Sequence, residues 1–497
     1  MTAAPRTAAI VNLGCKVNQA EMEGAARLLR ERGVRLVEAT ASADLVLVNT
    51  CTVTAVADEK SRAAVRRARR ANADAEIVVA GCSVQVDPST YAAIDPAARL
   101  VGNDGKAALL DELATLLPAG ADAPGVLGGA MPTLSGVDLV GASLADVSDD
   151  RAAVERTRAF VKVQDGCSFF CTYCIIPRAR GPERSLAPAA VIADVRRAVS
   201  LGHREVVLTG INLGTYDGGW SERGHRGTHI RSSLTLAGLV RRILAETGIE
   251  RLRLSSVEPQ HVDDELLETW VAGAPRTLPH LHLPLQSGDD GVLHRMGRRY
   301  ASGGYAQVVE RARAALRGVA IHADVIAGFP TEDDAAFDRT VGFLGALRPA
   351  GLHVFRYSAR PGTPALRMAG QVPERVKKAR SAALLALAEE ARVAFAREHL
   401  GGTATVLLER RIDDGRWVGH AADHVLVAVP AAAAPPHVDL ENAIATVGVE
   451  GLDPAVPERL EGRVLALDLP RRRLARPTLP MVDHGRLPAS SPLVAST

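Results

Sequence analysis

The 497-residue sequence has no long hydrophobic run, few aromatic residues and almost no net charge. No stretch approaches the roughly 18 to 20 apolar residues of a membrane-spanning helix, so we expect no membrane span. The formal net charge of +2 creates no overall field of the kind that marks a nucleic-acid binder. Only six of the 59 basic residues are Lys, a bias that we attribute to a GC-rich coding sequence rather than to phosphate recognition.

The N-terminus lacks the features of a secreted or lipid-anchored protein. Before Cys15, the segment MTAAPRTAAIVNLG offers only about eight apolar or small residues in a row. Asn12 interrupts them and stands three residues before the cysteine, where a lipoprotein signal normally has Leu. We therefore expect a cytoplasmic protein, long enough for two to four domains.

Cysteine is also scarce, and its placement is informative. The six cysteines form two groups of three, separated by a long cysteine-free stretch: Cys15, Cys51 and Cys82, then Cys167, Cys171 and Cys174. In a large cytosolic chain, such groups favour metal binding or catalysis over disulfides.

Residues 1–117 alternate apolar runs with helical patterns, which predicts a Rossmann-like parallel α/β domain. The runs AAIVNLGC, DLVLVNTC and EIVVAGC each end in a cysteine of the first group, and helices are expected over 20–32, 56–72 and 105–117. The carboxyl ends of parallel strands are where such sheets bind ligands. Three unrelated core thiols are the alternative, because free Cys is often buried. Three cysteines at three strand ends favour a three-thiolate iron–sulfur site.

The second group lies in FVKVQDGCSFFCTYC and has the spacing C-x3-C-x2-C after an apolar strand. Three thiolates in one compact loop can hold an iron–sulfur cluster and leave its fourth iron without a protein ligand. Structural zinc needs four ligands, and no His or fourth Cys lies close by in the sequence. An open iron suits chelation of a substrate or cofactor better than simple electron transfer.

Six apolar strands, each followed by a helical pattern, fill residues 153–399 and predict a partial (β/α)6 barrel. Polar or glycine residues follow the strands at the rim where barrel sites gather: Thr209, Gly210, Asn212, Ser256, Glu258, Gln286, Gly288, Gly328 and Pro330. Any one of them alone can be a turn residue. Their recurrence at one rim predicts a cofactor site.

The C-x3-C-x2-C loop after a strand resembles that of the radical S-adenosylmethionine (SAM) enzymes. This resemblance implies that SAM binds the open iron of the second triad. It further implies a set of softer SAM contacts: Thr209 and Gly210 near the amino group, Ser256 and Glu258 near the ribose or methionine part, Ala327, Gly328 and Phe329 around the adenine, and Gln286 and Arg298 at the same rim. Arg178, Arg180 and Arg298 could contact SAM carboxylate or RNA phosphate, or could simply be exposed. No catalytic residue is assigned beyond the cluster ligands.

Three N-terminal cysteines, a radical SAM triad and a small β domain together resemble the methylthiotransferase family, as do DGCSFFCTYCIIP, RLSSVEP and HLPLQSGDDGVLHRMGRRY. The resemblance implies two [4Fe–4S] clusters, the auxiliary one on Cys15, Cys51 and Cys82 and the SAM-binding one on Cys167, Cys171 and Cys174. It also implies SAM as both methyl donor and radical source. Sulfur would be inserted at an unreactive C–H bond and then methylated.

LGCKVNQ, LTGINLGTY and CIIPRARG resemble the branch that converts N6-threonylcarbamoyladenosine, next to the tRNA anticodon at position 37, to its 2-methylthio derivative. The same chemistry on N6-isopentenyladenosine of tRNA or on a ribosomal protein aspartate is the first alternative. A non-catalytic, metal-containing RNA-binding protein is an alternative of another class. GFPTED departs from the GFPGET usual in the family.

Residues 118–152 are predicted to be a linker, and short strands over 400–470 predict a small β-barrel, similar to the RNA-binding TRAM domain of that family. The segment is neither strongly basic nor aromatic, in a chain with 17 aromatic residues. Its candidate phosphate contacts, which could equally be solvated, are Arg410, Arg411, Arg416 and residues 471–473. Residues 471–497 are expected to be a disordered tail. The expected partners are the tRNA anticodon stem-loop and a low-potential donor such as flavodoxin or ferredoxin, and the expected state is a monomer.

Overall fold

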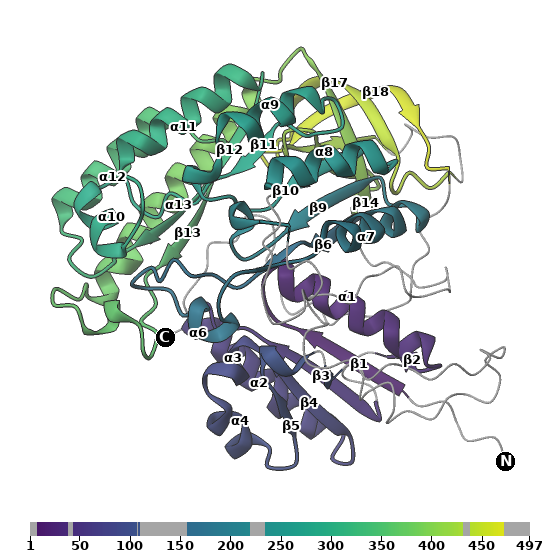
Figure 1. Cartoon of the computed structure of the whole chain (residues 1–497). Helices are drawn as coiled ribbons and strands as arrows, with labels where there is room; N and C mark the ends of the chain where they lie inside the picture. Colours follow the sequence, from purple (N-terminus) through teal and green to yellow (C-terminus); the bar gives the residue numbers. More distant parts are fainter. Residues whose placement is uncertain are drawn as a thin grey trace.

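The structure is a computed structural model that describes residues 7–37, 43–106, 108–109, 157–218, 234–430 and 438–471. Figure 1 shows three parts in chain order: an N-terminal α/β domain, a central barrel and a C-terminal β domain. The predicted linker and nearly all of the predicted tail lie outside the described residues, so the domain boundaries remain a prediction. None of the described helices is long and apolar enough to span a membrane.

The N-terminal domain is built on a parallel sheet with the order β2-β1-β3-β4-β5. Its strands are β1 (Thr7–Asn12), β2 (Arg35–Leu36), β3 (Leu45–Thr50), β4 (Glu76–Gly81) and β5 (Arg99–Val101). Its helices are α1 (Lys16–Glu31), α2 (Ala55–Ala71), α3 (Cys82–Val86) and α4 (Pro88–Ile94). Two apolar clusters pack on the sheet, as expected where helices cover both faces. Most of the helix predicted over 105–117 lies outside the described residues.

Six parallel strands form the predicted partial barrel (Figure 1): β6 (Arg158–Lys162), β9 (Glu205–Thr209), β10 (Arg251–Leu254), β11 (His280–His282), β12 (Ala320–Ala327) and β13 (Gly351–Arg356). They form two three-stranded sheets, β6-β9-β10 and β11-β12-β13, which a parallel bridge between Ser256 and His282 joins. The helices around them are α7 (Pro188–Ser200), α8 (Leu236–Glu246), α9 (Asp264–Ala272), α10 (Asp290–Met296), α11 (Ser302–Ala315), α12 (Asp334–Leu347) and α13 (Glu374–Arg397). One large apolar core lies between strands and helices.

The C-terminal domain is a closed barrel with the order β14-β15-β16-β18-β17. The strands are β14 (Thr403–Arg411), β15 (Trp417–Ala421), β16 (Leu426–Val429), β17 (Ile444–Leu452) and β18 (Leu460–Asp468). The stretch RWVGHAADHVLVAVP contains two of these strands, β15 and β16, joined by a turn. This domain contacts the central barrel through Arg251, whose guanidinium donates to the carbonyls of Thr405 (3.3 Å) and His420 (3.2 Å).

Candidate cluster and cofactor sites

The three N-terminal cysteines lie at the carboxyl ends of three adjacent parallel strands, as the sequence predicts. Cys15 is the N-cap residue of α1, Cys51 directly follows β3, and Cys82 is the first residue of α3 after β4. Because β1, β3 and β4 are neighbours in the sheet, the chain brings all three thiols to one edge. Cys15 is exposed there, whereas the other two thiols are buried.

At this edge of the sheet, the surrounding atoms leave no room for a side chain at Gly81. Gly81, just before Cys82, has a φ of 109°, and a Cβ there would lie 2.6 Å from Asn49 Oδ1 and 2.7 Å from the Thr50 carbonyl oxygen. Thr50 Oγ1 accepts a hydrogen bond from the Ser83 amide at 3.2 Å. This bond gives a partner to one of the backbone amides at the start of α3, which have none within the helix. The sequence GCS is therefore what allows β4 to turn directly into the cysteine-bearing helix.

The second triad lies between the two-residue strand β7 (Gln164–Asp165) and the short helix α6 (Ile176–Arg180). Gly166, before Cys167, has a φ of 72°, and a Cβ there would lie only 1.9 Å from the Pro182 carbonyl oxygen. Any other residue at this position would push the cysteine loop away from the chain behind it. The DGC sequence thus fixes where the loop begins.

N–H donors point at the cysteine sulfurs of both triads. Asn103 Nδ2 lies 3.4 Å from Cys82 Sγ, and Asn212 Nδ2 lies 3.7 Å from Cys167 Sγ. A further donor, Arg298 Nη1, lies 3.5 Å from the sulfur of the next cysteine in the loop. Hydrogen bonds to sulfur are one means by which proteins tune iron–sulfur clusters, so these donors fit thiolate ligands of such clusters.

The spacing of the sulfurs and the pKa values of the thiols bear on what they hold. In the part of the chain that the structure describes, only two groups of three potential ligand atoms lie within 4.8 Å of one another, and neither is a cysteine triad. A single zinc ion would bring its sulfurs to roughly 4 Å, given Zn–S bonds of about 2.3 Å. Burial raises the pKa of Cys51 and of Cys174 to about 12, and a bound metal ion would favour their thiolate forms. Each triad supplies three thiolates, the number that a cluster with one open iron requires, whereas structural zinc needs four ligands.

A buried network of charges joins the two triad-bearing domains. Arg180 on α6 is 1% exposed and donates to Glu21 (3.0 Å), Asp165 (2.8 Å) and Asn18 Oδ1. Glu21 on α1 also accepts from two lysines: Lys106 at 2.6 Å and Lys162 at 2.8 Å. Burial alone would raise the pKa of Glu21, but these cations hold it well below its usual range. The Glu21 carboxylate is therefore held as an anion among its cationic partners.

Asn103 makes a second link between the same two domains. Its Nδ2, which lies near Cys82 Sγ, also donates to the Ala179 carbonyl on α6 at 2.5 Å. One amide group thus contacts a ligand of the first triad and the helix that follows the second. The two triads are held by elements in direct contact.

The predicted SAM contacts at strands β9 and β10 lie at one rim. Thr209 ends β9 and is buried, and a Cβ on the following Gly210 would meet Gln164 Oε1 at 2.9 Å. Ser256 and Glu258 follow β10, as predicted. The close approach at Gly210 shows why a glycine stands where β9 meets the cysteine loop.

Two of the candidate arginines differ in their surroundings. Arg298 lies in the segment after α10, and its guanidinium pairs with the Glu258 carboxylate. Its side chain is 3% exposed, so Arg298 is buried and partnered rather than an exposed arginine. Arg178 is exposed and donates to the Pro361 carbonyl at 3.2 Å. Of the two, only Arg298 lies beside the predicted SAM contacts.

Gln286, the predicted contact after β11, is held by its backbone. It adopts a left-handed conformation with a φ of 70°, and its amide donates to the Asp324 carbonyl at 2.7 Å. The Ile326 amide in turn donates to the Gln286 carbonyl at 2.9 Å. Strand β12 therefore holds both the amide and the carbonyl of this residue, which fixes its position at the rim.

The predicted adenine contacts after β12 are mainly backbone. Ala327 ends β12 and is fully buried, and Gly328 follows it with a φ of 75°. Phe329 is fully buried in an apolar cluster, with its ring against those of Tyr173 and Tyr357. The Phe329 ring is therefore part of the core, and only its backbone remains a candidate for an adenine contact.

Two polar residues of the site were not singled out from the sequence. Gln164 is fully buried, and its Oε1 accepts from the amides of Ile211 (2.9 Å) and Asn212 (2.8 Å), which holds the loop after β9. Its only sequence signal is a polar residue at the end of the apolar run FVKVQDG. Glu21 gave no signal, because it looks like an ordinary acidic residue on an amphipathic helix.

A hydrogen-bonded chain behind Ser256 was also missed. Ser256 Oγ lies 3.2 Å from His282 Nδ1, and His282 Nε2 lies 2.7 Å from Asp324 Oδ1. His353 Nδ1 shares the same carboxylate oxygen at 3.1 Å. Burial would raise the pKa of Asp324, but its hydrogen bonds to the two histidines hold it well below its usual range. This series of hydrogen bonds fixes the orientation of the Ser256 hydroxyl at the rim.

Comparison with known proteins places these features in a family. Residues 7–102 match the model of "Uncharacterized protein family UPF0004", and residues 161–344 match that of the "Radical SAM superfamily". Threonylcarbamoyladenosine tRNA methylthiotransferase MtaB of Bacillus subtilis is 35% identical, over 85% of this chain and 90% of the relative. Its namesake in Thermotoga maritima is 34% identical, over 84% of this chain and 89% of the relative. The tRNA-2-methylthio-N(6)-dimethylallyladenosine synthase of Erythrobacter litoralis is 32% identical, over 84% and 90%.

Among solved structures, the radical SAM methyltransferase TsrM of Kitasatospora setae, with cobalamin and a [4Fe–4S] cluster bound, has a similar fold. Its TM-score is 0.51 at 19% sequence identity, and the similarity covers 73% of this chain and 77% of that one. The fold class expected from the sequence is therefore confirmed. Sequence relatives of nearly full length and the two matched family models agree, and the chain belongs to the radical SAM methylthiotransferase family.

Proposed function

We propose that this enzyme converts N6-threonylcarbamoyladenosine at position 37 of tRNA, next to the anticodon, to its 2-methylthio derivative. Its cofactors are two [4Fe–4S] clusters and SAM, in keeping with its family. The observation that carries the proposal is the pairing of two cysteine triads, each at the carboxyl edge of a parallel sheet, in domains that the Arg180 network joins directly. A reaction that inserts sulfur needs such a pair, because the sulfur must be presented close to the activated carbon.

The proposed ligands of the auxiliary cluster are Cys15, Cys51 and Cys82. Those of the SAM-binding cluster are Cys167, Cys171 and Cys174. Bound there, the two clusters and SAM supply hydrogen abstraction, the inserted sulfur and the methyl group. The exposed position of Cys15 leaves the auxiliary site open toward the substrate, whereas burial of Cys51 and Cys82 shields its other side from water.

The chain's own residues position the reactants. Arg298 and Glu258 neutralise each other at the rim, so a zwitterionic amino acid group such as that of SAM can bind there without leaving an unpaired buried charge. The Ser256 hydroxyl, oriented through His282, is available as a hydrogen-bond partner at the same rim. Asn212 and Arg298 donate toward cluster cysteines and thereby stabilise thiolate charge.

Lys16 supports the threonylcarbamoyl branch. It directly follows Cys15 at the N-terminal end of α1 and retains exposure to solvent. Desolvation of its ammonium by the surrounding protein lowers its pKa, and the charges of Arg158 and Arg253 act in the same direction. The threonylcarbamoyl group carries a carboxylate, whereas the isopentenyl group is neutral and apolar. A cation beside the auxiliary triad therefore favours the anionic substrate.

The test of this proposal is mass spectrometry of tRNA nucleosides from a strain that lacks the gene. Loss of the 2-methylthio derivative of N6-threonylcarbamoyladenosine, with restoration by the wild-type gene, is the expected result. If that nucleoside persists while 2-methylthio-isopentenyladenosine disappears, the branch is wrong, and the relatives of the dimethylallyladenosine type give the better guide. Complementation with the Lys16→Met variant separates substrate recognition from the radical chemistry. This variant should reduce the threonylcarbamoyl product without affecting SAM cleavage.

Partners beyond the tRNA follow from the same chemistry. A low-potential donor such as flavodoxin or ferredoxin would supply electrons to the SAM-binding cluster. The small β-barrel is the proposed RNA-binding module of TRAM type, with the exposed Arg410 and Arg411 as candidate phosphate contacts. Arg416 is a weaker candidate, because its guanidinium pairs with three carboxylates of the same domain. Of residues 471–473, only Arg471 lies within the described residues, and it is exposed.

A further inference from the structure

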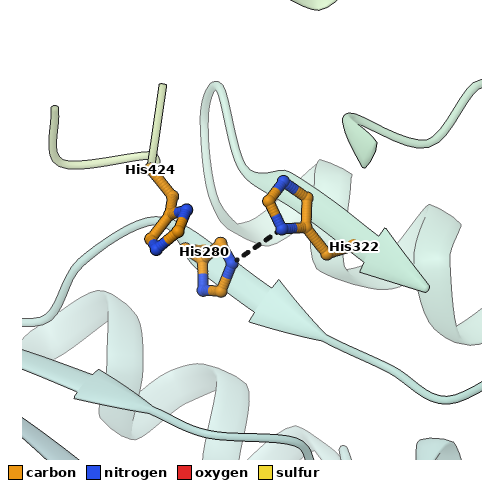
Figure 2. A group of neighbouring side chains, drawn as sticks. All are labelled: His280, His322 and His424. Carbon is orange, nitrogen blue, oxygen red and sulfur yellow. Dashed lines mark hydrogen bonds between the residues drawn. The ribbon is translucent and has the colours of Figure 1, made fainter. Parts of the chain in front are cut away.

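Three histidines meet where the central barrel contacts the C-terminal domain. His280 opens β11, His322 is the third residue of β12, and His424 lies in the turn between β15 and β16. Figure 2 shows the three rings gathered around one point, with His424 reaching in from the C-terminal domain. One potential ligand nitrogen from each ring lies within 4.8 Å of the others.

The distances within this histidine cluster suit a tetrahedral ion. His280 Nε2 and His322 Nδ1 are 3.3 Å apart and share a hydrogen bond, which an ion bound to both nitrogens would replace. Two nitrogens bound to one tetrahedral ion at 2.0 to 2.1 Å lie roughly 3.3 to 3.4 Å apart. The rings of His280 and His424 are stacked, with centroids 4.7 Å apart, so the His424 ring would have to turn for its in-plane lone pair to reach the same ion. The imidazole pair thus already has the separation of two ligands of a zinc-like ion.

The three rings are in the chemical state that binds metals. Burial lowers the pKa of His322 to about 3 and holds the pKa values of His280 and His424 well below the ordinary value of 6.5. The positive charges of Arg253 and Lys16 add to this effect at His280 and His322. Neutral imidazole is the form that offers a lone pair to a metal.

The cluster is not satisfied by its own hydrogen bonds. His280 Nδ1 is buried and has no hydrogen-bond partner within the described part of the chain. A buried polar atom of this kind in a native protein calls for an explanation, an ion or water among them. An ion bound at His280 Nε2 leaves this Nδ1 atom to a further partner such as a buried water, so the open valence marks the polar character of the site rather than the ion's own position.

The backbone at His424 is held in an unusual conformation. Its φ is 76°, in the left-handed region that non-glycine residues seldom adopt. Residues kept in such strained conformations cluster at ligand sites. Here the conformation turns the His424 ring toward the central barrel, as Figure 2 shows.

The arginines near the cluster are paired with carboxylates. Arg158 Nη1 lies 3.2 Å from His424 Nε2, and the Arg158 guanidinium also pairs with Glu409 at 3.1 Å. Arg253, which also faces the cluster, pairs with Glu205 at 2.9 Å. A metal that takes the Nε2 lone pair of His424 would displace Arg158, which keeps its bond to Glu409. Arg158 therefore competes with the metal rather than barring it.

We propose that His280, His322 and His424 bind one divalent transition metal ion of the zinc class, with a fourth position for water, and that this ion fastens the C-terminal β-barrel to the radical SAM barrel. Three imidazoles suit zinc, copper or nickel better than magnesium or calcium. Two ligands come from the central barrel and one from the C-terminal domain, so the ion would cross-link the two. The site lies outside the cysteine triads and does not depend on the proposed tRNA substrate.

The test uses full-length protein with both iron–sulfur clusters reconstituted, titrated anaerobically with Co²⁺ and then with Zn²⁺. In the difference spectrum against the Co²⁺-free protein, we expect one Co²⁺ per chain with the d–d absorption of a tetrahedral nitrogen site and no thiolate-to-cobalt charge-transfer band. Zn²⁺ should displace the Co²⁺, and the iron content should stay unchanged. His424→Asn is the first variant, because Asn tolerates the left-handed backbone. Loss of an outer partner of a ligand costs about 10- to 100-fold in metal affinity, so loss of the ligand itself should cost more than about 100-fold.

Three further variants complete the design. His322→Asn should weaken Co²⁺ binding as His424→Asn does. Arg158→Met should tighten it, because the competitor for His424 Nε2 is gone. His294→Asn, at an exposed histidine on α10, is the matched control and should bind Co²⁺ as the wild type does. The proposal is overturned if the wild type takes up no stoichiometric Co²⁺, if the Co²⁺ difference spectrum shows thiolate-to-cobalt charge transfer, or if both ligand variants bind with wild-type affinity. The wild-type result stands even if a variant fails to fold.

Discussion

Arg180 offers the sharpest test of how the two triads are held together. Replacing it by Met removes the donor shared by Glu21, Asp165 and Asn18 across the domain contact. Breaking a buried ion pair costs about 3 to 5 kcal/mol. Glu21 keeps its two lysine partners, so we expect the lower end, about 3 kcal/mol. This corresponds to a factor of about 100 in the opening equilibrium of the contact.

The assay is amide hydrogen exchange of α1, read by mass spectrometry, together with product analysis. In Arg180→Met, the exchange of α1 amides protected by the contact should accelerate by up to about 100-fold. SAM cleavage should persist, because all three cysteines of the second triad remain, while methylthiolation falls. Arg178→Met is the matched control on the same helix, since Arg178 is exposed and bonds only the Pro361 carbonyl among the contacts described above. Equal exchange and equal methylthiolation in the two variants would refute the reasoning.

Three other predictions follow from the sites. Cys171→Ala should abolish SAM cleavage to 5′-deoxyadenosine, whereas Cys51→Ala should retain some cleavage and stop thiolation. Chromatography of 5′-deoxyadenosine and of the thiolated product measures both activities. Equal loss of SAM cleavage in the two variants would contradict separate roles for the triads. Arg253 and Arg251 lower the pKa of Glu205 to about 2 against the effect of burial, so this carboxylate stabilises the fold above its ordinary pKa of 4.5, and that stabilisation is lost as the pH falls toward 2. The difference in melting temperature between wild type and Glu205→Gln should therefore shrink from pH 6 to pH 3. A difference that stays constant over this range would contradict the prediction. Arg298→Met should weaken SAM binding by about 10- to 100-fold in equilibrium dialysis, as expected for a lost charged hydrogen bond; unchanged binding would remove Arg298 from the SAM site.

The sequence predicts the fold class well because the parallel sheet of the N-terminal domain and the parallel strands of the central barrel are both buried on two faces. Continuous apolar runs that end in cysteine locate β1, β3 and β4, and their alternation with helices predicts a parallel sheet. That the three strands are neighbours in the sheet is known only from the structure. Compact spacing alone brings Cys167, Cys171 and Cys174 into one loop. These features depend on local pattern, which a single sequence carries.

Contacts between segments that are far apart in the chain could not be predicted from the sequence. Arg180 and Arg298 look like exposed arginines in an arginine-rich chain, yet each is buried against a carboxylate from far away in the sequence. Phe329 was assigned to the adenine site from its place in a motif, but its side chain packs in the core. The histidine cluster was missed because its members are spread from residue 280 to residue 424, and only the docking of the C-terminal domain brings them together.

The contact between α1 and α6 has a consequence for how the enzyme could be divided. The covalent connection between the two triad-bearing domains runs through residues 110–156, but the bonds of Glu21, Asn18 and Asn103 to the central barrel all lie outside that segment. The N-terminal domain also has apolar cores of its own. Two separately produced polypeptides, cut within that connection, should therefore reassociate into an active pair, and their affinity would measure the strength of the domain contact directly.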